Sequence, residues 1–172
     1  MINADLKQIK AVIFDVDGVL SKSTISLGSD GEPQRTVNIK DGYAMQFAVK
    51  CGIHLAILSG AKTESLRWRY ERLGIKDVFL GADVKIKFYD DFKKKYNLKD
   101  ENIIFVGDDI PDFQIMKICG LPCCPADAVP EIKAISKYIS FVKGGEGVAR
   151  DILEQILKAQ NLWMKDHSAF GW

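Results

Sequence analysis

The sequence predicts an α/β fold, a Rossmann-like, doubly wound parallel sheet with helices on both faces. Short apolar runs rich in β-branched residues alternate with longer amphipathic runs, which is the pattern of strands joined by crossover helices. The chain has 172 residues, of which 47% are hydrophobic, enough for one core and cramped for two. Because no linker, repeat or low-complexity segment interrupts it, we expect a single domain over residues 1–172.

The expected strands are short and apolar. They lie at residues 9–14, 53–58, 78–80 and 103–106, with shorter ones at 121–124 and 138–142. Helical patterns lie between them at residues 43–49, 63–73, 86–96, 113–118 and 129–136. In the last helix Val148, Ile152 and Ile156 are four apart, so they form one apolar face.

Residues 21–40 break this alternation directly after the first strand. Apolar and polar residues alternate at 25–27 and again at 37–39, around a turn signal at 29–31. This pattern predicts a small β-hairpin, a flap over residues 21–40. An insertion at this point lies over the carboxyl edge of the sheet, where ligands bind in such folds, although a simple connector is the alternative.

The overall composition argues against several kinds of partner. Lys and Arg number 24 and Asp and Glu 23, so the net charge of +1 disfavours a nucleic-acid partner. No apolar run approaches the ~18 residues that span a bilayer, which disfavours a membrane partner. The first ten residues lack the pattern of a signal peptide, so we expect a cytoplasmic protein.

The four cysteines do not have the spacing of a metal site. They stand at positions 51, 119, 123 and 124, and the two histidines, at 54 and 167, have no matching spacing to them. Zinc sites need a second Cys pair or suitably spaced histidines. We therefore expect structural cysteines.

Two carboxylates follow the first strand. Asp15 and Asp17 emerge at the carboxyl edge, and Gly18 lets the backbone turn away. Carboxylates held this close repel one another, so a metal or a proton should share the site. Alone, the motif could equally be a turn that uses one Asp, with the other solvated.

The later strands deliver polar groups to the same edge. Ser59 and Gly60 end the second strand at the start of a helix, and Lys85 follows the third. The fourth strand ends in Asp108, with Asp109 and Asp112 close behind. Carboxylates without His or Cys suit Mg²⁺, whereas a lysine, a hydroxyl and helix amides suit a phosphoryl group. Together these residues predict a phosphoryl-transfer site.

The ordered motifs resemble those of the haloacid dehalogenase superfamily of phosphohydrolases. They are Asp15 to Leu20 (DVDGVL), the Ser-Gly pair, the lysine and residues 107–112 (GDDIPD). Residues 38–43 (NIKDGY) and 144–147 (GGEG) resemble its capless phosphatases acting on 3-deoxy-D-manno-octulosonate 8-phosphate, a step of lipopolysaccharide sugar-acid biosynthesis. The resemblance covers residues 9 to about 158, and the tail 161–172 lies outside it.

The resemblance implies a role for each site residue. Asp15 would be the nucleophile that forms an aspartyl-phosphate, and Asp17 the general acid and base. Mg²⁺ would be held by Asp15, the Asp17 backbone carbonyl and Asp108. Ser59, Gly60 and Lys85 would bind the phosphoryl group, and Asp112 or Asp109 would orient Lys85 or the metal's waters. A helix-capping role for Asp109 is the alternative.

The chain has no room for a cap domain, either in the flap or between Ser59 and Lys85. The resemblance therefore implies a homotetramer in which a neighbouring subunit closes each site. Candidate contacts to a phosphorylated sugar acid are Arg69 and Arg72, which share a helix face, and Asp41 and Gly42 of the second motif. A guanidinium suits the carboxylate of a sugar acid.

Several readings stay open at this point. Arg67 is a third candidate for the intersubunit contact, while the alternative for all three arginines is a solvated helix face. We expect Trp68 to point toward the core or an interface. The substrate could instead be a nine-carbon sialic-acid-like 9-phosphate, although Ala61 after Ser59-Gly60 mildly favours the eight-carbon acid. A rival of another class is a non-catalytic phospho-accepting or regulatory domain.

Overall fold

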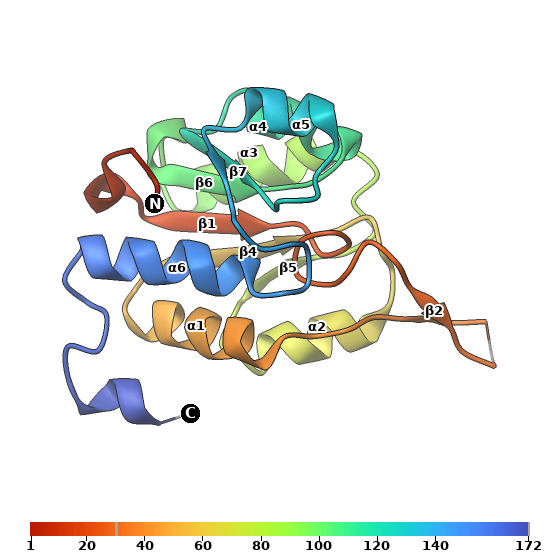
Figure 1. Ribbon diagram of the computed structural model, residues 1–172, viewed down its shortest axis with the longest axis horizontal. Coiled ribbons are helices and arrows are strands. Elements are labelled where there is room, and N and C mark those ends of the chain that lie inside the picture. The colour runs from red at the N-terminus through yellow and green to blue at the C-terminus, as the bar shows by residue number, and fades with distance from the viewer. Residues whose placement is uncertain (30, 172) are drawn as a thin grey trace.

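A six-stranded parallel sheet forms the centre of the computed structural model, which describes residues 1–29 and 31–171 (Figure 1). The strands are β1 (Ala11–Phe14), β4 (His54–Leu58), β5 (Asp77–Phe79), β6 (Ile103–Val106), β7 (Leu121–Cys124) and β8 (Tyr138–Ile139). Their order is β5-β4-β1-β6-β7-β8, so the chain builds outward from β1 on one side and then returns to its other side. A ligand site is expected at this reversal, beside the carboxyl end of β1.

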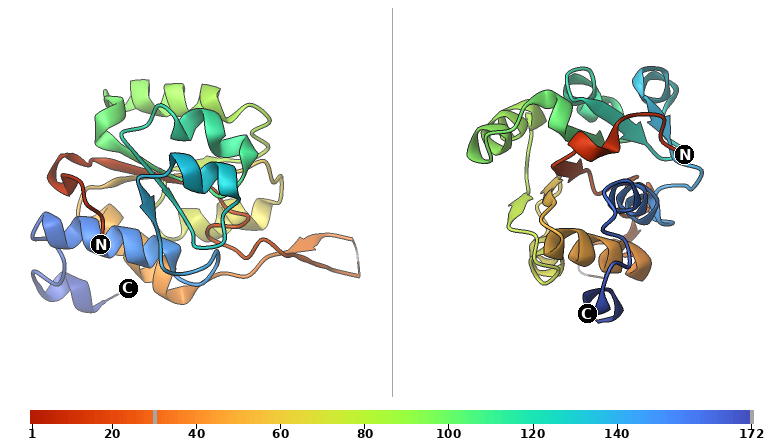
Figure 2. Two further views of the ribbon diagram at one scale, coloured as in Figure 1. Left: turned by 45° about the horizontal axis from the view of Figure 1, so that its top comes forward. Right: turned by 90° about the vertical axis from the view of Figure 1, so that its left-hand side faces the viewer.

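Helices cover both faces of the sheet, as the two views in Figure 2 show. On one face lie α1 (Ile39–Lys50), α2 (Glu64–Glu71) and α6 (Val148–Ala159). On the other lie α3 (Lys85–Lys95), α4 (Phe113–Met116) and α5 (Pro130–Ile135). The predicted doubly wound fold is therefore confirmed. Short 3₁₀ helices lie at Leu6–Gln8, Asp100–Asn102, Ile110–Asp112 and His167–Phe170.

Successive residues of the central strand feed two separate cores. Val12 and Phe14 of β1 pack with α1, α2 and α6, whereas Ala11 and Ile13 pack with α3, α4 and α5. All four are buried, which explains why the strand is continuously apolar instead of alternating. The predicted apolar face of the last helix is also buried and lies against α1.

The predicted hairpin is present, but its second arm was placed too late in the sequence. Its strands are β2 (Ser26–Leu27) and β3 (Pro33–Gln34), which pair antiparallel and project from the side on which the parallel strands end (Figure 1). Val37 lies outside either strand, and Ile39 begins α1 because Asn38 caps that helix. Residue 30 of the expected turn lies outside the described residues.

The tail folds back onto α1. The ring of Trp163 lies edge-on to Phe47 at 5.8 Å between ring centres, and the Tyr43 hydroxyl donates to the Ala169 carbonyl. Ala169 is buried by this contact. The tail is thus packed against the helix that carries one of the sequence motifs, while Trp172 lies outside the described residues.

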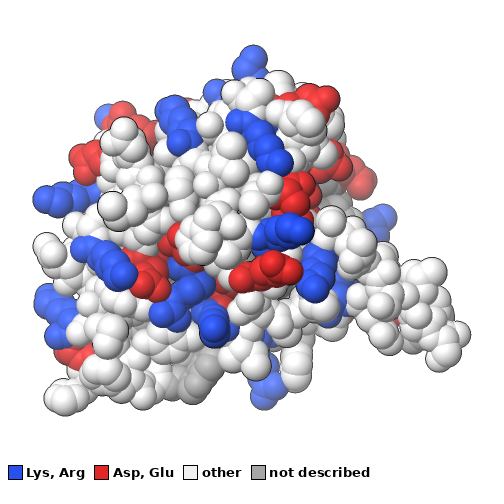
Figure 3. Space-filling view, viewed as in Figure 1, with Lys and Arg blue, Asp and Glu red and all other residues white. Residues whose placement is uncertain are grey.

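The surface carries mixed charge (Figure 3), and the cysteines form no disulfides. Figure 3 shows positive and negative side chains interspersed over the face in view, with a mainly uncharged hairpin. Among the described residues no helix combines the length and the apolar character that a membrane crossing needs. All four cysteines are free, and three of them are buried. In the described part of the chain, none belongs to a cluster able to hold a metal.

Candidate active site

Side chains from four strand ends line one cleft of about 430 Å³ at the carboxyl edge of the sheet. We call it the catalytic cleft. Phe14 lies beside both Ile57 and Val106 in the parallel register, so the segments that follow these residues leave the sheet at one level. The lining includes seven residues named from the sequence, Asp15, Asp17, Ser59, Gly60, Lys85, Asp108 and Asp109. Ser23, Ala61, Ala82, Asp83 and Pro111 complete it.

A buried lysine joins two buried carboxylates at the base of the cleft. Lys85 Nζ lies 2.9 Å from Asp15 Oδ2 and 2.7 Å from Asp112 Oδ1. Lys85 begins α3, and it is only 7% exposed. Asp112 is fully buried, and its second oxygen accepts a hydrogen bond of 3.1 Å from the Asp108 backbone amide. Asp112 therefore holds Lys85 in place, while its role in the reaction stays a prediction.

Three of these carboxylates could share a metal ion. Oxygens of Asp15, Asp108 and Asp112 lie within 4.8 Å of one another. Asp108 Oδ1 is buried without a hydrogen-bond partner, which is costly unless something else binds it. An all-oxygen donor set with an orphaned carboxylate fits Mg²⁺. The Asp17 side chain is not in this group, so that residue could contribute only through its backbone, as the resemblance implies.

The electrostatics of the cleft show an excess of negative charge. Burial, with the charge of Asp112, raises the pKa of Asp15 to about 8, although Lys85 opposes this. Burial, with the charges of Asp112 and Asp109, raises the pKa of Asp108 to about 7. The cluster therefore takes up either protons or a cation near neutral pH. A divalent ion would stabilise the ionised form that a nucleophilic carboxylate needs.

Glycines allow the backbone to approach these carboxylates closely. At Gly18, whose φ is +81°, an added Cβ would lie 1.9 Å from Asp108 Oδ2. A Cβ at Gly144 would lie 2.0 Å from the Gly18 carbonyl oxygen, so the glycine loop before α6 packs directly on the loop after β1. No other residue type fits at either position without displacing its neighbour.

The phosphate-binding candidates are held by local hydrogen bonds. Ser59 is almost fully buried, and its hydroxyl accepts a hydrogen bond of 3.1 Å from the Ala61 amide. The hydroxyl proton stays available to a ligand, since only a lone pair is used. Asp109 accepts a 2.8 Å hydrogen bond from the Ile110 amide, which is the capping role given above as the alternative.

Sequence reasoning missed Arg35, whose guanidinium binds both carboxylate oxygens of Asp17 through two of its nitrogens. Nε lies 2.6 Å from Asp17 Oδ1, and Nη2 lies 3.0 Å from Oδ2. Arg35 follows β3, so it belongs to the return arm of the hairpin. The one available signal was that it is the only arginine in residues 21–40.

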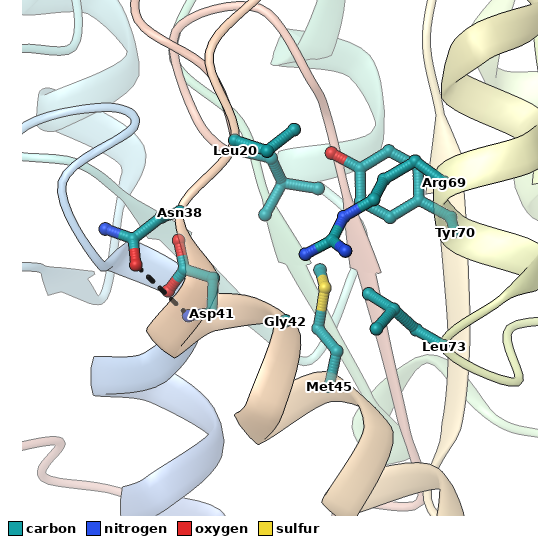
Figure 4. A pocket seen from close by; sticks show the side chains of 9 residues that line it. Leu20, Asn38, Asp41, Gly42, Met45, Arg69, Tyr70 and Leu73 are labelled. Atoms are coloured by element: carbon teal, nitrogen blue, oxygen red, sulfur yellow. Dashed lines mark hydrogen bonds between the residues drawn. The ribbon is translucent and has the colours of Figure 1, made fainter. Parts of the chain in front are cut away.

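Arg69, Asp41 and Gly42 meet at another place, which we call the second pocket (Figure 4). Figure 4 shows the Arg69 guanidinium pointing toward the first turn of α1, and a Cβ at Gly42 would lie 2.5 Å from its Nη2. Other lining residues are Leu20, Val37, Asn38, Met45, Tyr70 and Leu73.

The remaining arginines of α2 lie elsewhere. The Arg72 guanidinium stacks on Trp68 at 4.4 Å from the ring centre, so Arg72 does not accompany Arg69 into the second pocket. Trp68 is 62% exposed, so of the two expected places the core is wrong and an interface stays a prediction. Arg67 donates a 2.9 Å hydrogen bond to the Val78 carbonyl and so fixes α2 to β5.

Asp41 and Asn38 join the motif at residues 38–43 to the glycine motif at residues 144–147 and to the helix that follows it. Its Oδ1 accepts a 2.7 Å hydrogen bond from the Arg150 amide in the first turn of α6, whose own cap, Gly147, has no side chain. Its Oδ2 is buried without a partner, and burial raises the pKa of Asp41 to about 6. Asn38 caps α1 and also donates to the Gly145 carbonyl at 3.4 Å.

Comparison with known proteins places this arrangement in a family. A model of haloacid dehalogenase-like hydrolases matches residues 82–152. The 3-deoxy-D-manno-octulosonate 8-phosphate phosphatase of Escherichia coli K12 is 34% identical over 157 residues, covering 91% of this chain and 84% of the relative. The chain belongs to the haloacid dehalogenase-like hydrolase family. The resemblance inferred from its motifs is confirmed.

Solved structures of similar hydrolases share the fold of this one. The phosphatase of that name from Yersinia pestis has a TM-score of 0.88 at 32% identity, over 91% of this chain and 85% of that one. The enzyme from Moraxella catarrhalis has a TM-score of 0.87 at 32% identity, over 91% and 90%. That structure contains magnesium, phosphate and a KDO molecule. The hydrolase described here carries no cap domain in its described residues, as predicted.

Proposed function

We propose that this hydrolase removes phosphate from 3-deoxy-D-manno-octulosonate 8-phosphate in a Mg²⁺-dependent reaction of lipopolysaccharide sugar-acid biosynthesis. The observation that carries the proposal is the Asp15–Lys85–Asp112 cluster beside Asp108, in a chain that is 34% identical to phosphatases named for this substrate. We expect the whole chain to act as one domain, in the cytoplasm.

The first chemical step is transfer of the phosphoryl group to Asp15. A carboxylate oxygen attacks phosphorus, the bond from phosphorus to the sugar oxygen breaks, and Asp17 gives that oxygen a proton. Asp15 is oriented for attack because Oδ1 accepts from the Val16 amide at 2.7 Å while Oδ2 faces Lys85. The product is an aspartyl-phosphate and a free sugar acid.

The second step returns the enzyme to its starting state. Asp17 takes a proton from water, the water oxygen attacks phosphorus, and the bond to Asp15 breaks to release phosphate. Ser59, Gly60 and Lys85 bind the phosphoryl oxygens in both steps. Mg²⁺, held by Asp15, Asp108 and the Asp17 carbonyl, would offset the charge of nucleophile and phosphate. Asp112 keeps Lys85 between the carboxylates.

The carboxylate of the sugar acid needs a cationic partner, and among the described residues the one cation lining the catalytic cleft, Lys85, already binds Asp15 and Asp112. Arg69, with Asp41 and Gly42 beside it, is our first candidate for this partner, because a guanidinium pairs well with a carboxylate. Arg72 stacks on Trp68 and does not line the second pocket. Since the described residues include no cap domain, we expect a homotetramer in which a neighbouring subunit, through Arg72 or the hairpin, closes each site.

The test is phosphate release from the eight-carbon and nine-carbon sugar-acid phosphates, with and without Mg²⁺, using Asp15→Asn as the control. We expect Mg²⁺-dependent release, faster for the eight-carbon substrate, that Asp15→Asn abolishes. Preference for the nine-carbon phosphate would give the substrate assignment to the alternative. A phosphorylated Asp15 that persists for minutes would instead indicate a phospho-accepting regulatory domain.

A further inference from the structure

Arg35 binds Asp17 without itself lining the catalytic cleft. Asp17 lines the cleft and its side chain is 41% exposed, whereas the Arg35 side chain is 10% exposed. A largely buried guanidinium therefore binds a carboxylate that is open to the cleft.

The guanidinium is itself fixed on its third side. Its Nη1 donates a 3.2 Å hydrogen bond to Thr63 Oγ1. Thr63 stands at the N-cap position of α2 yet makes no side-chain capping hydrogen bond there. Its hydroxyl accepts a hydrogen bond from Arg35 instead of capping the helix. Three directed contacts, two to Asp17 and one to Thr63, leave the planar guanidinium a single orientation.

The side chain of the next residue, Thr36, is fastened to the loop after β1 as well. Thr36 Oγ1 lies 3.4 Å from the Ser21 hydroxyl and accepts a 3.4 Å hydrogen bond from the Lys22 amide. These contacts hold the base of the hairpin without touching Asp17. They offer a way to disturb the same segment while leaving the Arg35 contacts in place.

We propose that Arg35 is a positioning residue that fixes the Asp17 carboxylate for proton transfer to the sugar leaving group. The inference rests on the proposed function, in which Asp17 is the general acid. A carboxylate has about four lone-pair sites, and the arginine uses two of them. One of the remaining sites would hold the proton that Asp17 gives to the sugar oxygen as the bond between that oxygen and phosphorus breaks.

The experiment compares two substrates that differ in their need for that proton. An alkyl phosphate such as 3-deoxy-D-manno-octulosonate 8-phosphate must be protonated as it leaves, whereas p-nitrophenolate leaves without a proton. Values of kcat/KM report the steps up to leaving-group release, so they isolate the acid role of Asp17 from its later role as base. The protein used is the full chain with Mg²⁺.

We expect Arg35→Ala to lower kcat/KM for the sugar phosphate by roughly 10- to 100-fold, and for p-nitrophenyl phosphate by less than about 3-fold. Arg35→Lys keeps the positive charge but cannot bind both Asp17 oxygens in the same planar geometry. Its kcat/KM for the sugar phosphate should therefore lie between those of wild type and Arg35→Ala. Thr63→Val, which removes the third contact, should move the ratio in the same direction by a smaller amount. Asp17→Asn sets the upper limit of the effect.

The matched control is Thr36→Val, which loosens the hairpin base next to Arg35. It should leave the ratio between the two substrates unchanged. Equal losses on both substrates in Arg35→Ala would overturn the inference, and so would the same split in Thr36→Val. If Asp17→Asn itself shows no split, the proposed acid role of Asp17 fails. A split in Asp17→Asn without one in Arg35→Ala overturns the inference alone.

Discussion

The catalytic cleft and the second pocket differ in how their functional side chains are held in place. In the cleft, Asp15, Lys85 and Asp112 follow strand ends, are at most 7% exposed, and bind one another. In the second pocket, Arg69 extends a long side chain from α2 across to α1, and it rests on a glycine. Buried side chains that bind one another suit a reaction that tolerates little displacement. A long side chain between two helices can adjust to the shape of a substrate.

Removing the charge at the centre of the cleft should have the largest effect. Lys85→Met leaves Asp15 and Asp112 buried and facing each other without a counter-charge, so we expect kcat to fall by roughly 10²–10³-fold and the free energy of unfolding by about 3–5 kcal/mol. Phosphate release and chemical denaturation would measure the two. Lys87→Met on the exposed face of the same helix is the control. A fully stable Lys85→Met would show that the ion pairs of Lys85 do not hold the cleft rigid.

Paired glycine substitutions compare the two regions directly. In Gly18→Ala the new Cβ meets the short, half-buried Asp108 side chain at a positive φ, so we expect a fall of about 100-fold in kcat/KM and weaker Mg²⁺ binding. In Gly42→Ala the new Cβ meets only the end of a flexible arginine, so p-nitrophenyl phosphate hydrolysis should change by less than about 3-fold. Similar losses in both variants would contradict the contrast.

Arg69→Ala tests whether the second pocket serves the substrate. Losing a charge-assisted hydrogen bond should raise KM for the phosphorylated sugar acid by about 10-fold or more. The same variant should hydrolyse p-nitrophenyl phosphate, which has no sugar acid, as well as wild type does. Arg67→Ala, whose side chain lies against β5, distinguishes this effect from a general loosening of α2. Equal losses on both substrates would count against substrate contact by Arg69.

The smallest expected effect is the pH dependence contributed by Asp41. Its pKa is raised from 3.8 to about 6 by burial, so between these values the folded state holds a proton that the unfolded state has released. Stability therefore falls as pH rises through that window. In Asp41→Asn this contribution is absent. Between pH 4 and pH 6.5 the free energy of unfolding of the variant should therefore rise by at least about 1 kcal/mol relative to that of wild type. If the stability of wild type and of Asp41→Asn changed in parallel over this pH range, Asp41 would be ionised throughout it in the folded protein and the prediction would be wrong.

Most of the catalytic cleft could be predicted because a parallel sheet imposes its register. Once strands are assigned, the residues after them must meet at one edge, and this placed Asp15, Ser59 and Asp108 together. The hairpin was harder. Its strands have two residues each, too few for an alternating pattern, and the Asn38 cap gave Ile39 to a helix.

The contacts that sequence analysis missed join residues distant in the chain. Arg35 and Asp17 are 18 positions apart, and Asp41 and Arg150 are 109 apart, with no periodicity to connect either pair. Helical periodicity did put Arg69 and Arg72 on one face. It could not show that Arg72 would turn to Trp68, four residues earlier, because stacking on an aromatic ring competes with every other use of a guanidinium.

The packing of Gly144 on the Gly18 carbonyl has a consequence for synthesis on the ribosome. The loop after β1 emerges long before the glycines that close its wall and the helix capped by Asp41. A nascent chain therefore carries its acidic loop unfinished until α6 has been translated. Truncation before α6 should consequently damage a site whose nucleophile lies far upstream in the chain.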